Sequence, residues 1–182
     1  MSRALLVIDV QNEYFPGGAY PITFPINSLN RITDAMDGAA EAKVPIVVVQ
    51  HGTENPEAKA FQKGTRGWQL KGEVDVRKRT LVIEKKLPGS FTGTNLEQWM
   101  RDSGVDTLVV CGYMTQLCCD TTARQAQHLG FKVEFLSDAT GTLDIVNEAG
   151  KISAEELQRA ILVTQQSNFS RVLTTEAWIE SL

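Results

Sequence analysis

Six short apolar runs, spread along the chain, constrain its fold more than any other feature of the sequence. Each run is apolar at consecutive rather than alternate positions, and most are rich in β-branched residues, which is typical of strands covered on both faces in a parallel sheet. We therefore expect a mostly parallel, six-stranded sheet. The runs are 4–8, 46–49, 81–83, 108–111, 133–136 and 172–173.

Helical patterns lie between these runs, and capping residues precede several of them. Asn27 or Ser28 can cap the first, Thr94 a later one, and Ser153 with Glu156 forms a capping box before another. Strands that alternate with helices predict a three-layer α/β/α fold with a doubly wound, Rossmann-like sheet and right-handed crossovers. The length of 182 residues suits a single domain over residues 1–182.

Charge and cysteine content narrow the possible partners. The net charge is only −4 and no Lys/Arg-rich run stands out, so we expect a small-molecule substrate rather than nucleic acid. No apolar stretch is long enough for a membrane span, and the N-terminus enters a strand at once, which leaves no room for a signal peptide. Three cysteines form no disulfide framework, so we expect a reducing, cytoplasmic setting.

The segment Gly112–Cys118 is the strongest functional signal. Cys118 lies where a predicted strand, 107–111, turns into a predicted helix, 120–129. The free N–H groups and positive dipole end of a helix favour a thiolate, which is the nucleophile of cysteine chemistry. Cys111 and Cys119 are expected to pack in the core. The adjacent pair Cys118–Cys119 also permits a redox role, but it lacks the Cys-x-x-Cys spacing typical of that chemistry.

Charged residues end two other predicted strands. Asp9 ends the first, and Lys85 and Lys86 end the third. Each position alone is as easily a solvated strand end, but ligands of such sheets bind beyond the carboxyl ends of the strands. We therefore expect Asp9 to act as a general base, and an ammonium beside it to lower the pKa of the Cys118 thiol.

Histidine placement argues against a metal site. His51 ends the second strand and could face the same cleft, whereas His128 lies near a helix end and is expected at the surface. Neither has a partner with metal-ligand spacing, so we expect no metal and no cofactor. The polar stretch Gly52–Arg79 is long for a connection in a compact domain, and such loops are often functional.

These residues resemble the isochorismatase-like cysteine hydrolase superfamily from Leu5 to about Thr175. Four pieces in the right order carry the resemblance. They are Leu-Leu-Val-Ile-Asp9-Val-Gln-Asn, Val-Ile-Glu-Lys85 followed by Phe91-Thr-Gly-Thr94-Asn-Leu96, Val-Val-Cys-Gly112-Tyr-Met-Thr115-Gln-Leu-Cys118-Cys-Asp-Thr-Thr122-Ala, and Leu-Ser-Asp138-Ala139.

The resemblance implies a catalytic triad of Asp9, Lys85 and Cys118, with Lys86 as the rival lysine because Pro-Gly-Ser before Phe91 departs from the usual form. It also implies a non-proline cis peptide at Met114–Thr115. This bond would help to aim N–H groups, including that of Cys118, into an oxyanion hole. Dimers or larger homo-oligomers are expected by the same resemblance.

The resemblance leaves the substrate open. Gln50-His51-Gly lacks the metal-binding Asp-x-His of nicotinamidases, so nicotinamide is disfavoured. An intact cysteine favours C–N cleavage of a small amide, ureido or carbamoyl compound over the vinyl ether cleavage of true isochorismatases. A nucleotide-binding module without catalysis is a further alternative, although Gly-x-Gly-x-x-Gly is absent after the first strand. The expected substrate-contacting residues are Gln11, Phe15, His51, Trp68, Phe91 and Leu117.

Overall fold

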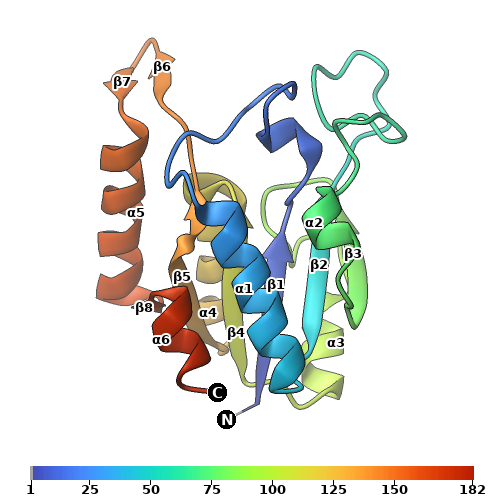
Figure 1. Cartoon of the computed structure of the whole chain (residues 1–182), viewed down its shortest axis with the longest axis vertical. Helices are drawn as coiled ribbons and strands as arrows, with labels where there is room; N and C mark the ends of the chain where they lie inside the picture. Colours follow the sequence, from blue (N-terminus) through green and yellow to red (C-terminus); the bar gives the residue numbers. More distant parts are fainter. Residues whose placement is uncertain (1) are drawn as a thin grey trace.

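A six-stranded parallel sheet forms the centre of the structure, a computed structural model that describes residues 2–182 (Figure 1). The strand order is β3-β2-β1-β4-β5-β8, and every neighbouring pair is parallel. All six predicted strands are present, so the α/β fold expected from the apolar runs is confirmed. The strands are β1 (Arg3–Ile8), β2 (Ile46–His51), β3 (Leu81–Lys85), β4 (Thr107–Tyr113), β5 (Lys132–Gly141) and β8 (Arg171–Leu173).

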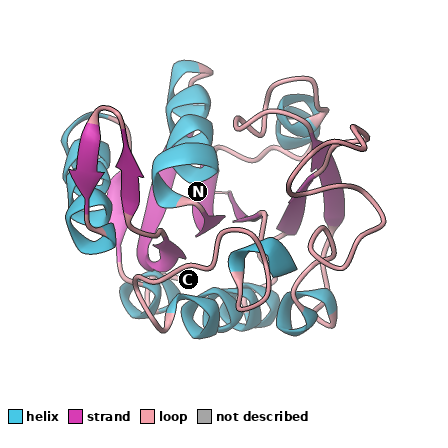
Figure 2. Cartoon of the chain, turned by 90° about the horizontal axis from the view of Figure 1, so that it is seen from above, coloured by secondary structure: helices cyan, strands magenta, loops and turns pink. Residues whose placement is uncertain are grey.

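Helices cover both faces of the sheet, as the view from above shows (Figure 2). One face packs on α1 (Ser28–Glu41), α2 (Gly72–Asp75) and α6 (Thr175–Ile179), and the other on α3 (Leu96–Asp102), α4 (Asp120–His128) and α5 (Ala154–Asn168). Along β1, Leu5 and Val7 belong to the first core and Leu6 and Ile8 to the second, so this strand is buried on both sides. None of the helices within residues 2–182 is long and apolar enough to cross a bilayer.

Short elements complete the carboxyl end of the sheet. They are the one-turn η1 (Asn12–Tyr14), the π-helical turn η2 (Thr115–Cys119), and the antiparallel hairpin of β6 (Ile145–Asn147) and β7 (Gly150–Ile152). The hairpin was not expected, because three-residue strands on a surface carry little hydrophobic pattern. The capping box of Ser153 and Glu156 is confirmed, whereas the Ser28 hydroxyl bonds the Tyr113 hydroxyl instead of capping α1.

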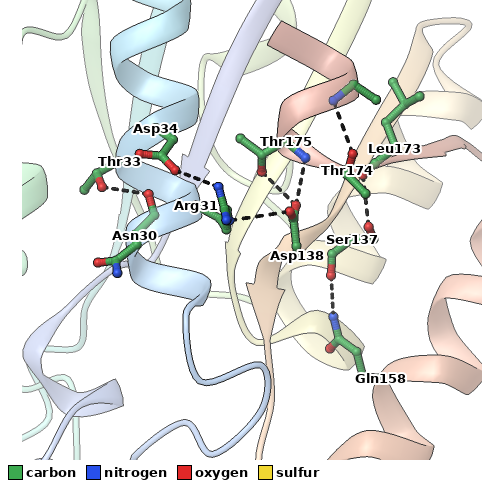
Figure 3. A network of polar contacts seen from close by, with 11 residues as sticks. Asn30, Arg31, Thr33, Asp34, Ser137, Asp138, Gln158, Leu173, Thr174 and Thr175 are labelled. Atoms are coloured by element: carbon green, nitrogen blue, oxygen red, sulfur yellow. Dashed lines mark hydrogen bonds and ion pairs between the residues drawn. The ribbon is translucent and has the colours of Figure 1, made fainter. Parts of the chain in front are cut away.

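A polar network ties the last part of β5 to both helical layers (Figure 3). Asp138 accepts hydrogen bonds from the backbone N–H and the hydroxyl of Thr175, at 2.8 and 2.7 Å, at the start of α6. Arg31 of α1 lies 3.9 Å from the same carboxylate. On the other side, Gln158 of α5 donates to the carbonyl of Ser137. This network holds the strand that lies beside β4 and its turn.

Gly112 allows the end of β4 to approach β1. Its φ is +117°, a conformation that side chains rarely adopt, and a Cβ at this position would collide with the backbone of Ile8. Ile8 is the register partner of Gly112, and Asp9 follows it with φ +52°. The close approach therefore places the turn after β4 beside Asp9.

We expect Gly112→Ala to destabilise the fold far more than Gly104→Ala. Gly104 also has a positive φ, +67°, but open space surrounds it, so alanine there should cost only about 1 kcal/mol of backbone strain. Gly112→Ala adds a backbone collision and should cost at least about 3 kcal/mol. Urea unfolding of both variants measures the difference, and equal losses would contradict this role for Gly112.

Candidate active site

Three strand ends bring a carboxylate, an ammonium and a thiol together. Lys85 Nζ lies 2.7 Å from Asp9 Oδ2 and donates a hydrogen bond of 3.3 Å to Cys118 Sγ. Asp9 follows β1, Lys85 ends β3, and Cys118 lies in η2 directly after β4. Their exposed fractions are 0%, 2% and 6%, so the cluster is buried. The juxtaposition expected from the strand-end argument is therefore observed.

The alternation of β3 distinguishes the two lysines. Ile83 and Lys85 are buried, whereas Glu84 and Lys86 are exposed. Successive side chains of a strand point to opposite faces, so only one of two adjacent lysines can reach the cluster. Lys85 comes two residues after the apolar Ile83, so the two side chains share one face of the strand. This spacing is a signal in the sequence that favours Lys85 over Lys86 as the lysine of the cluster.

The three groups shift one another's pKa. Burial raises the pKa of Asp9, and the attraction of Lys85 only partly offsets this. Burial alone would lower the pKa of Lys85, but the attraction of Asp9 and Cys118 outweighs it and the pKa is raised. Burial, reinforced by Asp9 and opposed by Lys85, raises the pKa of Cys118 to about 12. Lys85 therefore lowers the pKa of the Cys118 thiol, as expected, but desolvation outweighs it and the net shift is upward.

The resting cluster thus holds a neutral thiol rather than a preformed thiolate. Both carboxylate oxygens of Asp9 are buried without a hydrogen bond of ordinary geometry within residues 2–182, and Oδ2 is held by the ion pair with Lys85. Asp9 and Cys118 each perturb the pKa of the other, although no hydrogen bond of ordinary geometry joins them in this structure. A free carboxylate oxygen beside a thiol can accept its proton, and such catalytic contacts are often loose in the absence of substrate.

The turn that carries Cys118 starts earlier than the sequence suggested. The helical backbone begins at Thr115, so Cys118 lies inside its first turn. The non-proline cis peptide is at Tyr113–Met114, one residue before the expected Met114–Thr115. The chain reverses there because β4 stays paired through Tyr113, whereas Met114 already occupies the N-cap of η2.

Hydrogen bonds fix the turn that carries Cys118. The carbonyl of Met114 accepts the N–H groups of Leu117 and Cys119, both at 3.2 Å. The hydroxyl of Thr142 donates to the side-chain oxygen of Gln116 at 2.7 Å, which fixes the turn to the end of β5. Thr115 is fully buried and its hydroxyl has no partner among the described residues.

The amide of Gln11 is bonded to backbone groups near the site. It accepts the N–H of His51 at 2.9 Å and donates to the carbonyls of His51 and Trp68 at 2.8 and 2.7 Å. Both amide hydrogens are therefore used, and the side chain is fully buried. The substrate contact expected of Gln11 stays a prediction, and it would require one of these bonds to be exchanged.

Three other expected pocket residues lie at the edge of the site or away from it. Phe15 packs against Tyr113 and under the ammonium of Lys71, and Phe91 stacks on Phe131 at 6.1 Å between ring centres. Both rings are thus occupied by packing. Leu117 is 44% exposed on the outside of the turn that carries the cysteine.

His51 and Trp68 do adjoin the cluster. His51 Nδ1 lies 3.2 Å from Lys85 Nζ, and the Trp68 indole covers Gly52, the next residue along the chain. The ring of His51 also contacts Phe61 edge-on, with ring centres 5.2 Å apart. His51 thus contacts Lys85 directly, whereas Trp68 contacts the residue that follows His51.

The role of Glu13 was not expected from the sequence. Its buried carboxylate accepts the N–H groups of Ala19 and Phe61, at 2.8 and 3.2 Å, and so joins two loops over the carboxyl end of the sheet. An acidic residue shortly after a strand is typical of a surface turn. Only the tertiary contacts show that this carboxylate is a buried hydrogen-bond acceptor.

Cavity size does not single out the site. A cavity of about 530 Å³ lies at the opposite end of the sheet, among α4, α5 and the starts of β5 and β8. A cavity of about 360 Å³ borders Lys85, and Thr92 and Leu87 are among its lining residues. Asp9, His51 and Cys118 do not line the second cavity, and the side chain of Lys85 has no exposure, so neither cavity is assigned to the cluster. Within residues 2–182, no group of three or more His, Cys, Asp and Glu side chains is arranged to hold a metal ion.

Comparison with known proteins gives a consistent family. The model of the isochorismatase domain matches residues 3–177. The isochorismatase family protein YddQ of Bacillus subtilis (strain 168) is 33% identical over 99% of this chain and 100% of its own length. Nicotinamidase 3 of Arabidopsis thaliana is 31% identical over 98% of this chain and 88% of its own length.

Solved structures agree with this result. A candidate isochorismatase from Burkholderia xenovorans LB400 superposes with a TM-score of 0.96 at 45% identity, covering 99% of this chain and 86% of that one. A cysteine hydrolase from Pseudomonas syringae pv. phaseolicola 1448A has a TM-score of 0.91 at 25% identity, covering 98% and 91%.

We expect Lys85→Met to slow alkylation of Cys118 by iodoacetamide at least about tenfold at pH 8, because losing a cation 3.3 Å from the sulfur raises the thiol pKa further. Lys86→Met, the matched control, should stay within about twofold, since its side chain is exposed. Peptide mass spectrometry measures labelling at Cys118 alone, and circular dichroism checks folding. Equal rates in the two folded variants would exclude Lys85 from this role.

Proposed function

The chain belongs to the isochorismatase family of hydrolases, and we propose that it is a cysteine-dependent member that cleaves a C–N bond of a small amide, ureido or carbamoyl compound. The observation that carries the proposal is the contact of one buried ammonium, Lys85, with both Asp9 and Cys118. Cys111 and Cys119 are fully buried, and within residues 2–182 Lys85 donates a hydrogen bond to the sulfur of Cys118 and to neither of these. Cys118 is therefore the nucleophile of the proposal.

The first half-reaction begins with proton transfer. Asp9 takes the proton of the Cys118 thiol, and the sulfur attacks the carbonyl carbon of the substrate. Lys85 keeps the carboxylate and the developing thiolate beside each other in a buried setting. The negative charge that develops on the substrate oxygen is accepted by the Cys118 N–H, a kind of donor typically worth about 3 kcal/mol.

Collapse of this intermediate breaks the C–N bond. Asp9 returns its proton to the departing nitrogen, and ammonia or an amine leaves while a thioester remains on Cys118. In the second half-reaction Asp9 takes a proton from water, and the hydroxide attacks the thioester. The carboxylic acid product leaves, and the proton goes back to the sulfur, so the cycle needs only water.

The relatives support C–N cleavage. The Arabidopsis relative is a nicotinamidase, by name an amide hydrolase, and the Pseudomonas structure is that of a cysteine hydrolase. We do not propose nicotinamide as the substrate, because Gln50-His51-Gly52 lacks the Asp-x-His pattern that is expected for nicotinamidases.

We expect Cys118→Ala to lower kcat/KM at least about 1,000-fold on any amide or ureido acid that the wild type hydrolyses, because no nucleophile remains. Cys119→Ala is the matched control and should stay within about threefold. The measurement is a screen of small amides, ureido acids and isochorismate, with thermal unfolding to show that both variants fold.

Two results of this screen would contradict the proposal. One is amide hydrolysis that survives in the folded Cys118→Ala variant. The other is turnover of isochorismate alone with no loss in that variant, which would assign the chain to vinyl ether cleavage without a cysteine nucleophile.

A further inference from the structure

The ammonium of Lys85 has three hydrogens and three acceptors around it. Besides Asp9 Oδ2 at 2.7 Å and Cys118 Sγ at 3.3 Å, it meets His51 Nδ1 at 3.2 Å. An ammonium can only donate, so Lys85 directs one hydrogen at His51 Nδ1 and one at Cys118 Sγ, and it holds Asp9 Oδ2 as an ion pair. His51 is thus a third member of the buried coordination around Lys85, from the end of β2.

This contact fixes the tautomer of His51. Because Lys85 donates to Nδ1, that nitrogen must be unprotonated, and the proton of the neutral ring must be on Nε2. In a neutral histidine, the hydrogen bond made by one ring nitrogen determines whether the other nitrogen carries the proton. The ring therefore has one free donor, Nε2–H, on the side opposite the ammonium.

The position of the ring is fixed as well. Gln11 bonds both the N–H and the carbonyl of His51, and Phe61 packs against the ring edge-on at 88°. The residue is only half-buried. Nε2 has no hydrogen-bond partner within residues 2–182, and it is not among the polar atoms that are buried without one. The donor is therefore rigidly held, unused and accessible.

We propose that His51 recognises the substrate through Nε2–H, which donates to a carboxylate or carbonyl oxygen that two carbon atoms separate from the scissile carbonyl. The inference rests on the proposed function. Lys85 bonds both His51 Nδ1 and Cys118 Sγ, so Nδ1 is the ring nitrogen nearer the sulfur. Nε2–H points away from the ammonium, so its acceptor lies farther from the sulfur than the ring does. The substrate class narrows to small amides that carry an acceptor oxygen at this distance.

Charge on the ring would oppose this arrangement. Burial and the Lys85 ammonium lower the pKa of His51, and Asp9 raises it less. These are the two charged side chains that face it, from β3 and β1. The ring is neutral above its lowered pKa. Protonation at lower pH would place a second cation against Lys85 and remove the acceptor.

The tautomer can be measured without a substrate, since the chain has only two histidines. In ¹H–¹⁵N spectra of the imidazole nitrogens near pH 7, we expect His51 as the Nε2–H tautomer, with a pKa below that of His128, the internal control. In Lys85→Met the pKa of His51 should rise and His128 should not change. An Nδ1–H tautomer in the wild type, or a His51 pKa unaffected by Lys85→Met, would overturn the inference.

Recognition is tested with succinamate, an amide whose carboxylate is two carbon atoms beyond the scissile carbonyl, and with butyramide, which lacks that acceptor. In the Cys118→Ala protein, succinamate should shift the His51 Nε2–H resonance and butyramide should not. Adding His51→Phe should weaken succinamate binding about tenfold. Equal responses to the two amides, or none to either, would overturn the recognition role. Loss of Cys118 dependence in the activity screen would instead overturn the proposed function and leave the tautomer result intact.

Discussion

The ion pair between Lys85 and Asp9, with no exposure of either side chain, is the interaction on which the rest of the site depends. Each charge alone would be costly to bury, and breaking such a pair by removing one partner typically costs about 3–5 kcal/mol. The pair also sets the proton distribution, since burial leaves the nearby thiol neutral and the carboxylate able to accept its proton. The same ammonium reaches Cys118 and His51, so one side chain orients every polar group of the cluster.

The fold supplies this pair through the ends of parallel strands. Asp9 and Lys85 follow β1 and β3 on either side of β2, and Gly112 lets β4 approach β1 closely enough to bring Cys118 alongside. Gln11 and Glu13 are fixed by backbone groups and hold the surrounding loops. Side chains that bind no substrate thus determine the position of those proposed to do so, as preorganised sites require.

The sequence was sufficient for the sheet and for the residues that meet, because both follow from patterns within single segments. Consecutive apolar residues identify buried parallel strands, and polar residues at their carboxyl ends converge at one edge. It was not sufficient for the thiol pKa, since desolvation depends on how closely the loops cover Cys118. The amide of Gln11 bonds the backbone of His51, and the ring of His51 contacts Lys85. Both contacts join segments that are far apart in the sequence, so no local pattern encodes them.

The most direct test of the central claim is to look for the covalent intermediate on Cys118. The wild-type enzyme turns over an amide found in the substrate screen, and the reaction is quenched with acid. Mass spectrometry then measures the mass of the intact protein and of its peptides. The account predicts that the protein gains the mass of the acyl group and that this mass is located on the peptide containing Cys118. Turnover with no adduct on that peptide, or with an adduct on another residue, would contradict it.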